Sequence, residues 1–546
     1  MKLSRLFLGA SLAVLLCPFT LSAQETHQHK HEMGEKLGRV NFAVSCNRAA
    51  QQQFNRAVAL LHSFWYEEAQ KGFVEVTKTD AKCGMGYWGI AMSSYHPVWA
   101  PPIPADLQNG VVAVQQANLV GARTQRERDY IKAIETFYQA ADKVDHRTRA
   151  LAYEKAMEQL YLSYPKDHEA AVFYALALLG TALPTDKTYA NQKKAAEILN
   201  KILVNEPEHP GVAHYLIHSF DYPALAPLAL AAARSYARIA PSSPHALHMP
   251  SHIFTRLGLW QESIESNIAS AAAAKNHVAK THPGAASFDQ LHAMDYLAYA
   301  YLQTAQDGKV KEIVDALYGM NKVDAITFIP AYAFAAIPAR YALERRQWSE
   351  AAALKVHPAD FPWKNFSYAE AMIYFARSLG ASRMGNTAAA SKEIEWLSSI
   401  QKSLVEAKES YWATQVEIER RTAAAWLAHA EGKQEEALRL MRSAADLEDT
   451  TEKHPVTPGA IVPARELLGE LLLELREPQQ ALKEFEASLL VSPNRFHGLY
   501  GAAKAAELSG DREKARTFYA KLTALGERSD GQRPELQAAK VFLAVK

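Results

Sequence analysis

The C-terminal part of the chain repeats itself every 34 residues, and no other feature of the sequence limits the fold as strongly. The segment GELLLELREPQQALKEFEASLLVSP is followed by AAKAAELSGDREKARTFYAKLTALG. Gly469 aligns with Ala503 and Phe485 with Tyr519, and the members of each pair are 34 residues apart. A period of about 20–50 residues is typical of repeat proteins, in which each unit packs mainly against its neighbours. One continuous array of repeats is therefore expected, rather than several separate domains.

These positions resemble the tetratricopeptide repeat, a unit of two antiparallel helices. Gly469 stands at the small-residue position of the first helix, and Ala481 and Phe485 stand at the alanine and aromatic positions of the second. Pro493 closes the unit. Small residues let the two helices approach closely, and the aromatic ring fills the gap to the next unit. The same pattern recurs at Ala57, Ala69 and Phe73, and again at Ala425, Ala437 and Met441.

The resemblance covers most of residues 41–546, although residues 107–200 and 366–400 fit the period only loosely. It implies an all-α fold, a solenoid of antiparallel helix pairs whose first helices line a concave groove. Proline-rich insertions interrupt the period, and proline ends helices. Long loops in a compact fold usually have a function, so we expect these loops to fold over the groove. The insertions are HPVWAPPIPAD from His96, NHVAKTHPGAASF from Asn276, HPADFPW from His357 and HPVTPGAIVP from His454.

Histidines recur at matching positions of two consecutive units in the middle of the chain. The segments GVAHYLIHSFD and SPHALHMPSHIFTR occupy the first helices of these units, so His214 aligns with His248 and His218 with His252. At about 100° per residue, the histidines of each segment share one helical face. The resemblance implies that this face lines the groove. Asp221 and His245 extend the two stripes, and the next unit places His292 and Asp295 at the positions of His245 and His248.

Such a face is suited to holding a transition metal. Packed helices lie about 8–10 Å apart, so imidazoles on neighbouring helices can converge on one ion. The donors outnumber the four ligands of a structural zinc site, which predicts either more than one ion or one ion surrounded by further histidines. Zinc, copper and iron all accept imidazole ligands. The candidate ligands are His214, His218, Asp221, His245, His248, His252, His292 and Asp295.

Histidines that only pack between repeats are the alternative interpretation. Packing alone does not predict two pairs in register, and the register favours metal binding. Five other histidines show no such pattern and are interpreted as packing residues. They are His62, His96, His357, His429 and His497.

The N-terminus has the pattern of a secretory signal peptide. Lys2 and Arg5 precede an apolar run over residues 6–16, and small residues predict cleavage after Ala23, so that residues 1–23 are removed. No later stretch has the 18 or more apolar residues of a membrane span. We therefore expect a periplasmic or secreted protein.

Residues 24–40 form a histidine-rich leader between the signal peptide and the repeats. Short tracts of this kind can capture copper or zinc, and a flexible polar leader is the alternative. The metal-capable residues of the leader are His27, His29, His31 and Met33.

Two cysteines remain after the signal peptide, which contains Cys17, is removed. Cys46 and Cys83 form an even pair in an oxidising compartment, and this favours one disulfide. Two free thiols or two metal ligands are the alternatives.

The charge balance excludes one class of partner. The chain has 60 Lys+Arg against 59 Asp+Glu, so it has no basic surface expected for nucleic acid or anionic lipid. The family resemblance instead implies a protein, peptide or small-molecule ligand in the groove.

Two functions fit these features. The first is an exported repeat protein that holds a partner and a metal in its groove. The second is a metalloenzyme in which the metal activates water or oxygen, with Glu466 and Glu470 as candidate proton-transfer groups. The histidine motifs also resemble those of uncharacterised exported bacterial repeat proteins, a likeness that implies no activity.

Overall fold

The structure is a computed structural model, and it describes residues 35–98 and 101–545. The expected signal peptide and the leader histidines lie outside these residues. From Lys36 onwards the chain forms one compact unit. The predicted all-α fold is confirmed, because the described residues form helices and their only β-type contact is an isolated bridge between Ala286 and Val323.

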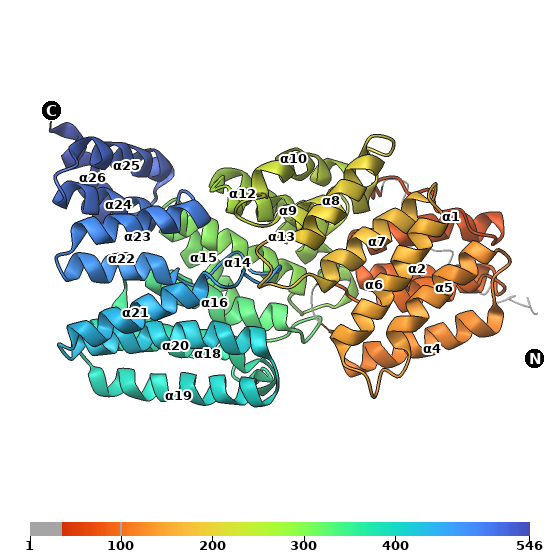
Figure 1. Ribbon diagram of the computed structural model, residues 1–546, viewed down its shortest axis with the longest axis horizontal. Coiled ribbons are helices and arrows are strands. Elements are labelled where there is room, and N and C mark those ends of the chain that lie inside the picture. Colours follow the sequence, from red (N-terminus) through yellow and green to blue (C-terminus); the bar gives the residue numbers. More distant parts are fainter. Residues whose placement is uncertain (1–34, 99–100, 546) are drawn as a thin grey trace, which may run out of the picture. The chain divides into compact units, whose positions relative to one another are not determined.

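Helices follow one another in chain order, as Figure 1 shows. The first run is α1 (Arg48–His62), α2 (Tyr66–Thr79), α3 (Gly84–Ser93), α4 (Pro104–Val120), α5 (Gln125–Tyr138), α6 (His146–Ser163), α7 (His168–Thr181) and α8 (Ala190–Leu203). The middle run is α9 (Pro210–Phe220), η1 (Ala226–Ala229), α10 (Leu230–Ile239), α11 (Pro244–His248), α12 (Pro250–Arg256), α13 (Trp260–Thr281), α14 (Phe288–Gln303), α15 (Asp307–Tyr318), α16 (Phe328–Glu344) and α17 (Trp348–Ala352). The last run is η2 (Trp363–Phe366), α18 (Ser367–Arg383), α19 (Thr387–Glu406), α20 (Ser410–Ala430), α21 (Gln434–Glu448), α22 (Ala464–Glu474), α23 (Pro478–Val491), α24 (Phe496–Leu508), α25 (Arg512–Leu525), η3 (Gly526–Arg528) and α26 (Pro534–Ala544).

Each helix packs mainly against the helices before and after it, as in a tetratricopeptide-like solenoid. The predicted small and aromatic positions make this packing possible. A Cβ atom on Gly469 of α22 would lie 2.8 Å from the Phe485 ring of α23, and one on Gly501 of α24 would lie 2.2 Å from it. The Phe485 ring therefore fills the space between its own repeat and the next one, and only glycine leaves room for it.

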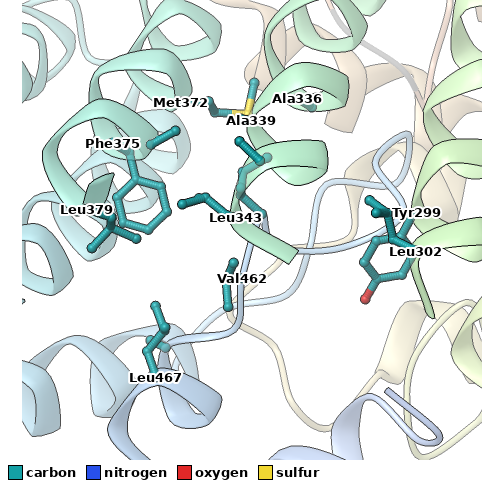
Figure 2. Packing of buried hydrophobic residues seen from close by; sticks show 14 of the residues in the cluster. Tyr299, Leu302, Ala336, Ala339, Leu343, Met372, Phe375, Leu379, Val462 and Leu467 are labelled. Atoms are coloured by element: carbon teal, nitrogen blue, oxygen red, sulfur yellow. The ribbon is translucent and has the colours of Figure 1, made fainter. Parts of the chain in front are cut away.

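The apolar core is divided into two large clusters along the chain. One cluster runs from Leu37 to Phe254, and the other runs from Trp260 to Ala539. Figure 2 shows part of the second cluster, where side chains of α14, α16 and α18 meet Val462 and Leu467. The division between the clusters falls at α12 and α13, beside the histidines predicted to bind metal.

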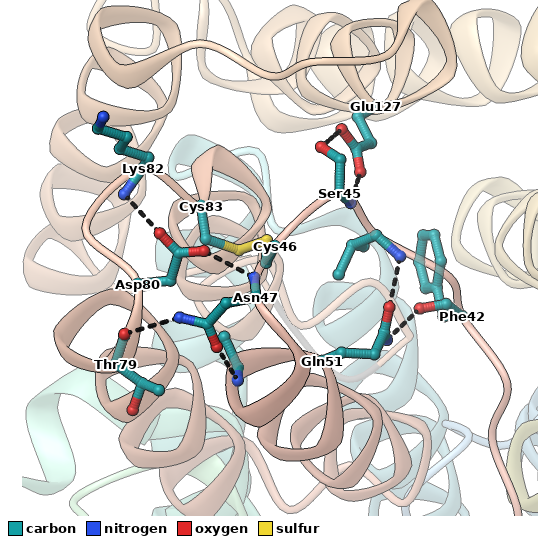
Figure 3. Close-up of a disulfide and its surroundings, with 12 residues drawn as sticks. Phe42, Ser45, Cys46, Asn47, Gln51, Thr79, Asp80, Lys82, Cys83 and Glu127 are labelled. Atoms are coloured by element: carbon teal, nitrogen blue, oxygen red, sulfur yellow. Dashed lines mark hydrogen bonds between the residues drawn. A yellow bond between two sulfur atoms is a disulfide. The ribbon is translucent and has the colours of Figure 1, made fainter.

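The predicted disulfide is present. Cys46 and Cys83 are bonded, with their Cα atoms 5.1 Å apart, and they join the entrance of α1 to the start of α3 (Figure 3). Hydrogen bonds surround the bridge, because Asp80 accepts from the backbone N–H of Asn47 at 2.7 Å and of Lys82 at 3.1 Å. A crosslink of this kind stabilises a terminal repeat, which lacks a neighbour on one side, by about 2–4 kcal/mol.

The compact unit begins slightly before the expected start of the repeats at residue 41. Leu37 and Val40 are buried against the first cluster, and the Lys36 N–H donates to Ser242 Oγ at 2.9 Å. Within the part of the chain that the structure describes, no helix is long and apolar enough to cross a membrane.

Candidate metal centre

Six of the predicted ligands are histidines that the fold brings together on four helices. His214 and His218 lie on α9, His245 and His248 on α11, His252 on α12 and His292 on α14. Figure 1 places α9, α12 and α14 in the yellow and green part of the chain. All six side chains are buried, with at most 6% of any residue exposed. The resemblance implied a groove-facing stripe, but these imidazoles are enclosed, so only an ion or a small molecule can reach them.

A proline divides the segment HALHMPSHIF into two short helices. Pro250 has no backbone N–H to continue the hydrogen bonds of α11, and α12 begins at this residue. Ser243 caps α11, since its hydroxyl accepts from the Ala246 N–H at 3.4 Å. As a result, His245 faces the histidines of α9, whereas His248 and His252 face His292.

The first histidine group consists of His214, His218 and His245. Their ring nitrogens lie within 4.8 Å of one another. His214 Nε2 is 3.1 Å from His218 Nε2 and 3.2 Å from His245 Nε2. His214 Nδ1 donates to the His62 carbonyl oxygen at 2.6 Å, which leaves a lone pair on His214 Nε2.

The second histidine group consists of His248, His252 and His292, whose ring nitrogens also lie within 4.8 Å of one another. His248 Nδ1 donates to Asn267 Oδ1 at 2.6 Å. His252 Nδ1 donates to Asp221 Oδ2 at 3.0 Å. Hydrogen bonds of this type fix the tautomer and the ring orientation of metal-binding histidines.

The closest contact within the second group lacks a hydrogen. Because His248 and His252 both donate through Nδ1, each ring in its neutral form has only a lone pair on Nε2. These two Nε2 atoms are 3.0 Å apart. Two lone pairs at this distance repel each other unless a cation lies between them. Two nitrogens bound at about 2.0–2.1 Å to one tetrahedral metal ion are about 3.3 Å apart, close to the spacing in both groups.

A proton is a poor substitute for that cation. Burial is the main cause that lowers the pKa of each imidazole in both groups, to about 3 for His214 and well below the ordinary value for His218, His245, His248 and His292. Burial also lowers the pKa of His252, although Asp221 opposes the shift. At neutral pH the six rings are therefore neutral and can act as metal ligands.

The two groups are adjacent. The ring centroids of His245 and His248 are 6.0 Å apart, and those of His218 and His252 are 6.1 Å apart. Each group supplies three ligands, one fewer than a closed structural zinc site. The arrangement is thus suited to two neighbouring ions, each with an open coordination position.

The two predicted aspartate ligands lie outside both groups. Asp221 holds His252 and also accepts from Arg256 Nε at 2.9 Å and Lys453 Nζ at 2.7 Å. Burial alone would raise the pKa of Asp221, but the charges of Lys453 and Arg256 hold it well below its ordinary value. Asp295 pairs with Arg340. Both carboxylates are thus engaged by cations of the protein.

The candidate proton-transfer groups also form ion pairs away from the histidines. Glu466 is fully buried and accepts from Arg495 Nε at 2.9 Å and from its terminal nitrogen at 3.1 Å. Glu470 pairs with Arg346. These contacts give both carboxylates a structural role, and neither touches the two histidine groups.

A third cluster, which the sequence interpretation missed, consists of His62, Glu169 and His209. His62 Nε2 donates to Glu169 at 2.8 Å and His209 Nε2 donates at 3.0 Å. The opposite nitrogens accept, His62 Nδ1 from the Tyr215 hydroxyl at 2.9 Å and His209 Nδ1 from the Val212 N–H at 3.3 Å. Every ring nitrogen in this cluster has a complementary partner without a metal.

The proline-rich segment from His454 covers the second group, as expected for one of the insertions. Lys453 reaches Asp221, and the Thr457 carbonyl accepts from the Tyr296 hydroxyl at 3.1 Å. Tyr296 in turn packs against His248, with the ring centroids 4.7 Å apart. Residues 451–459 therefore close the site against water.

Comparisons with known proteins leave the histidines without a precedent. No family model and no curated protein matches the chain. The human IFIT1 dimer with PPP-AAAA is similar at 11% identity and a TM-score of 0.38, covering 80% of this chain and 90% of that chain. The Cut9–Hcn1 hetero-tetramer of the APC/C is similar at 13% identity and a TM-score of 0.35, covering 91% and 84%. Yeast Tom70 is similar at 11% identity and a TM-score of 0.34, covering 91% and 95%.

Proposed function

We propose that this protein holds two neighbouring transition-metal ions inside a tetratricopeptide-like scaffold, one in each histidine group. The observation that carries the proposal is the contact of His248 and His252, whose facing Nε2 atoms have no hydrogen between them at 3.0 Å. Six imidazoles with no carboxylate among them suit copper, zinc or iron rather than magnesium or calcium. The predicted signal peptide supports the same role in an exported protein.

The ligand count favours a reactive centre over a purely structural one. Three protein ligands and an open position are the arrangement of catalytic zinc sites. Bound ions of this kind activate water or oxygen. The protein supplies the enclosure, because the segment through Lys453 and Thr457 covers the second group, and it supplies orientation through Asn267 and Asp221.

A binding protein without catalysis is the second candidate, and burial of the histidines is the observation that favours it. A buried pair of ions can serve as a store or as a fold-stabilising element. In that case the partner, a protein or peptide, occupies a different surface of the solenoid. Turnover of a substrate by the metal-loaded protein distinguishes the two candidates.

Metal analysis tests the proposal directly. The mature chain is loaded with copper, zinc or iron, separated from free metal and analysed by mass spectrometry. About two ions of at least one metal per chain are expected. The double variant His218→Ala/His252→Ala removes one ligand from each group, so its metal content should fall to near zero.

A matched control replaces two histidines outside the groups. His168→Ala/His429→Ala removes the same number of imidazoles, each of which pairs with a glutamate elsewhere. This variant should keep both ions. If the wild-type chain retains none of the three metals, or if the His218/His252 variant retains its full content, the proposal fails.

A further inference from the structure

A small cavity lies between α18, α20 and the segment from Lys453 to Val462, and its volume is about 60 Å³. That volume is far below the roughly 300–1,000 Å³ of a drug-sized ligand site. It suits a molecule of a few non-hydrogen atoms. The polar residues that matter for its chemistry are Gln415, Glu419, Glu448, Lys453 and Thr457.

Aromatic rings form one side of the cavity. Tyr368 and Trp412 are stacked, with ring centroids 4.1 Å apart and an interplanar angle of 8°. The Tyr411 ring meets Trp412 edge-on at 5.0 Å, and Tyr332 lies 6.5 Å from it. The face of an aromatic ring is electronegative and attracts cations within about 6 Å.

Two carboxyl groups lie on the same cavity. Among the described residues, the buried Oε2 atom of Glu419 has no hydrogen-bond partner. Burial raises the pKa of Glu419 to about 8. Burial is also the main cause that raises the pKa of Glu448, to about 7, although this carboxyl accepts from the Ala464 N–H at 2.8 Å. A buried carboxyl without a partner stays largely protonated until a cation binds beside it.

The neighbouring cations of the protein are already engaged. Lys453 Nζ donates to Asp221 at 2.7 Å, away from Glu419. On α20 itself, Arg420 and Arg421 both pair with Glu417, at 2.7 Å each. Glu419 therefore has room for an external counter-ion.

We propose that this cavity binds the ammonium group of a small organic amine, with Glu419 as counter-ion and the apolar part of the amine against Trp412. Two carboxyl groups disfavour an anion. A neutral alcohol could satisfy the hydrogen bond but could not form the ion pair or the cation–π contact. The proposal rests on the cavity alone and does not require metal in the histidine groups.

Calorimetric titration of the metal-free mature chain tests the proposal, with n-butylamine and n-butanol as probes of equal chain length. The amine should bind at least tenfold more tightly than the alcohol. Glu419→Gln has nearly the same shape but no negative charge, so it should abolish that preference. Glu417→Gln is the matched control on the same helix, because its carboxylate is engaged by two arginines, and it should keep the preference.

A second variant separates loss of binding from loss of folding. Trp412→Phe keeps an aromatic face but reduces its area, so amine affinity should fall severalfold while helicity by circular dichroism is unchanged. Equal binding of butanol and butylamine, undiminished amine binding by Glu419→Gln, or no binding of either probe at millimolar concentration would each overturn the proposal.

Discussion

Two kinds of histidine cluster lie close together in this protein, and they differ in one respect. In the cluster of His62, Glu169 and His209, each ring nitrogen that donates faces a carboxylate oxygen, and each one that accepts faces an N–H or O–H. In the second histidine group, His248 and His252 face each other with two lone pairs at 3.0 Å.

The difference shows that proximity alone is weak support for a metal site. All three clusters have ligand atoms within 4.8 Å. What separates them is whether donors and acceptors balance without a metal. The clusters are also connected, because the His62 carbonyl fixes His214 of the first group. A satisfied cluster thus supports one that requires an ion.

The largest effect we expect is on stability when metal is removed. A ligand that binds only the folded state adds about 4 kcal/mol per site when its free concentration is about 1,000 times Kd. Chelation of the loaded wild-type chain should therefore lower its unfolding temperature by several degrees. The His218→Ala/His252→Ala variant should show no such decrease. A chelator that leaves the wild-type unfolding temperature unchanged would count against both histidine groups.

The division into two groups is tested by single substitutions. His245→Ala removes a ligand of the first group only, and His292→Ala removes one of the second only. Each variant should lose about one of the two ions, with the other retained. If either variant loses both ions, the six histidines form a single interdependent site.

The satisfied cluster gives the contrasting result. His209→Asn keeps an acceptor for the α9 N-terminus, because asparagine is a good N-cap residue. Metal content should remain at its wild-type value in this variant. Loss of an ion would show that the cluster of His62, Glu169 and His209 takes part in metal binding.

Much of the fold could be predicted from sequence because its cause is local. The positions of Gly469, Ala481 and Phe485 set how closely two helices pack, and this information repeats every 34 residues. The segments 107–200 and 366–400 fitted the period loosely, yet they form helices that pack on their neighbours in the same way. Here packing of apolar faces replaces the small-residue signature.

The site could be predicted only in part. Register identified His214, His218, His248 and His252, but it treated HALHMPSHIF as one continuous stripe. Pro250 interrupts that stripe and assigns its histidines to two groups.

The partners of the histidines were missed for a different reason. Asn267, Lys453 and Glu169 approach from segments far away in sequence, and no spacing rule connects them to a histidine. Asp221 was identified from its position on the stripe, and the structure places it behind His252 instead of among the ring nitrogens.

A smaller effect is expected from the aspartate that orients His252. Asp221→Asn removes the negative charge from the bond to His252 Nδ1. Loss of such a supporting carboxylate typically reduces metal affinity about 10–100-fold. The second group should weaken by this factor, and the first should be unaffected. Asp295→Asn, which disrupts the pair with Arg340, is the control and should leave both affinities unchanged.

The smallest effect on metal binding is expected at Glu169, and here the comparison is tested through pH. Burial alone would raise the pKa of Glu169, but His209 and His62 bring it well below its ordinary value of 4.5. Between those two pKa values the unfolded chain binds more protons than the folded chain, so stability rises with pH. The contribution is complete above about pH 4.5 and is lost as the pH falls.

Glu169→Gln removes this contribution while keeping the shape of the side chain. The metal-free variant should be less stable than the metal-free wild type by about 1.5–3 kcal/mol at neutral pH, the usual range for hydrogen bonds to a charged group. That difference should shrink as the pH falls below 4.5, and denaturant unfolding at a series of pH values measures it. Metal content at neutral pH should be unchanged, because no atom of Glu169 reaches either histidine group. A variant with wild-type stability at pH 7, or one that loses an ion, would mean that the satisfied cluster and the two histidine groups are not distinct in the way their hydrogen bonds indicate.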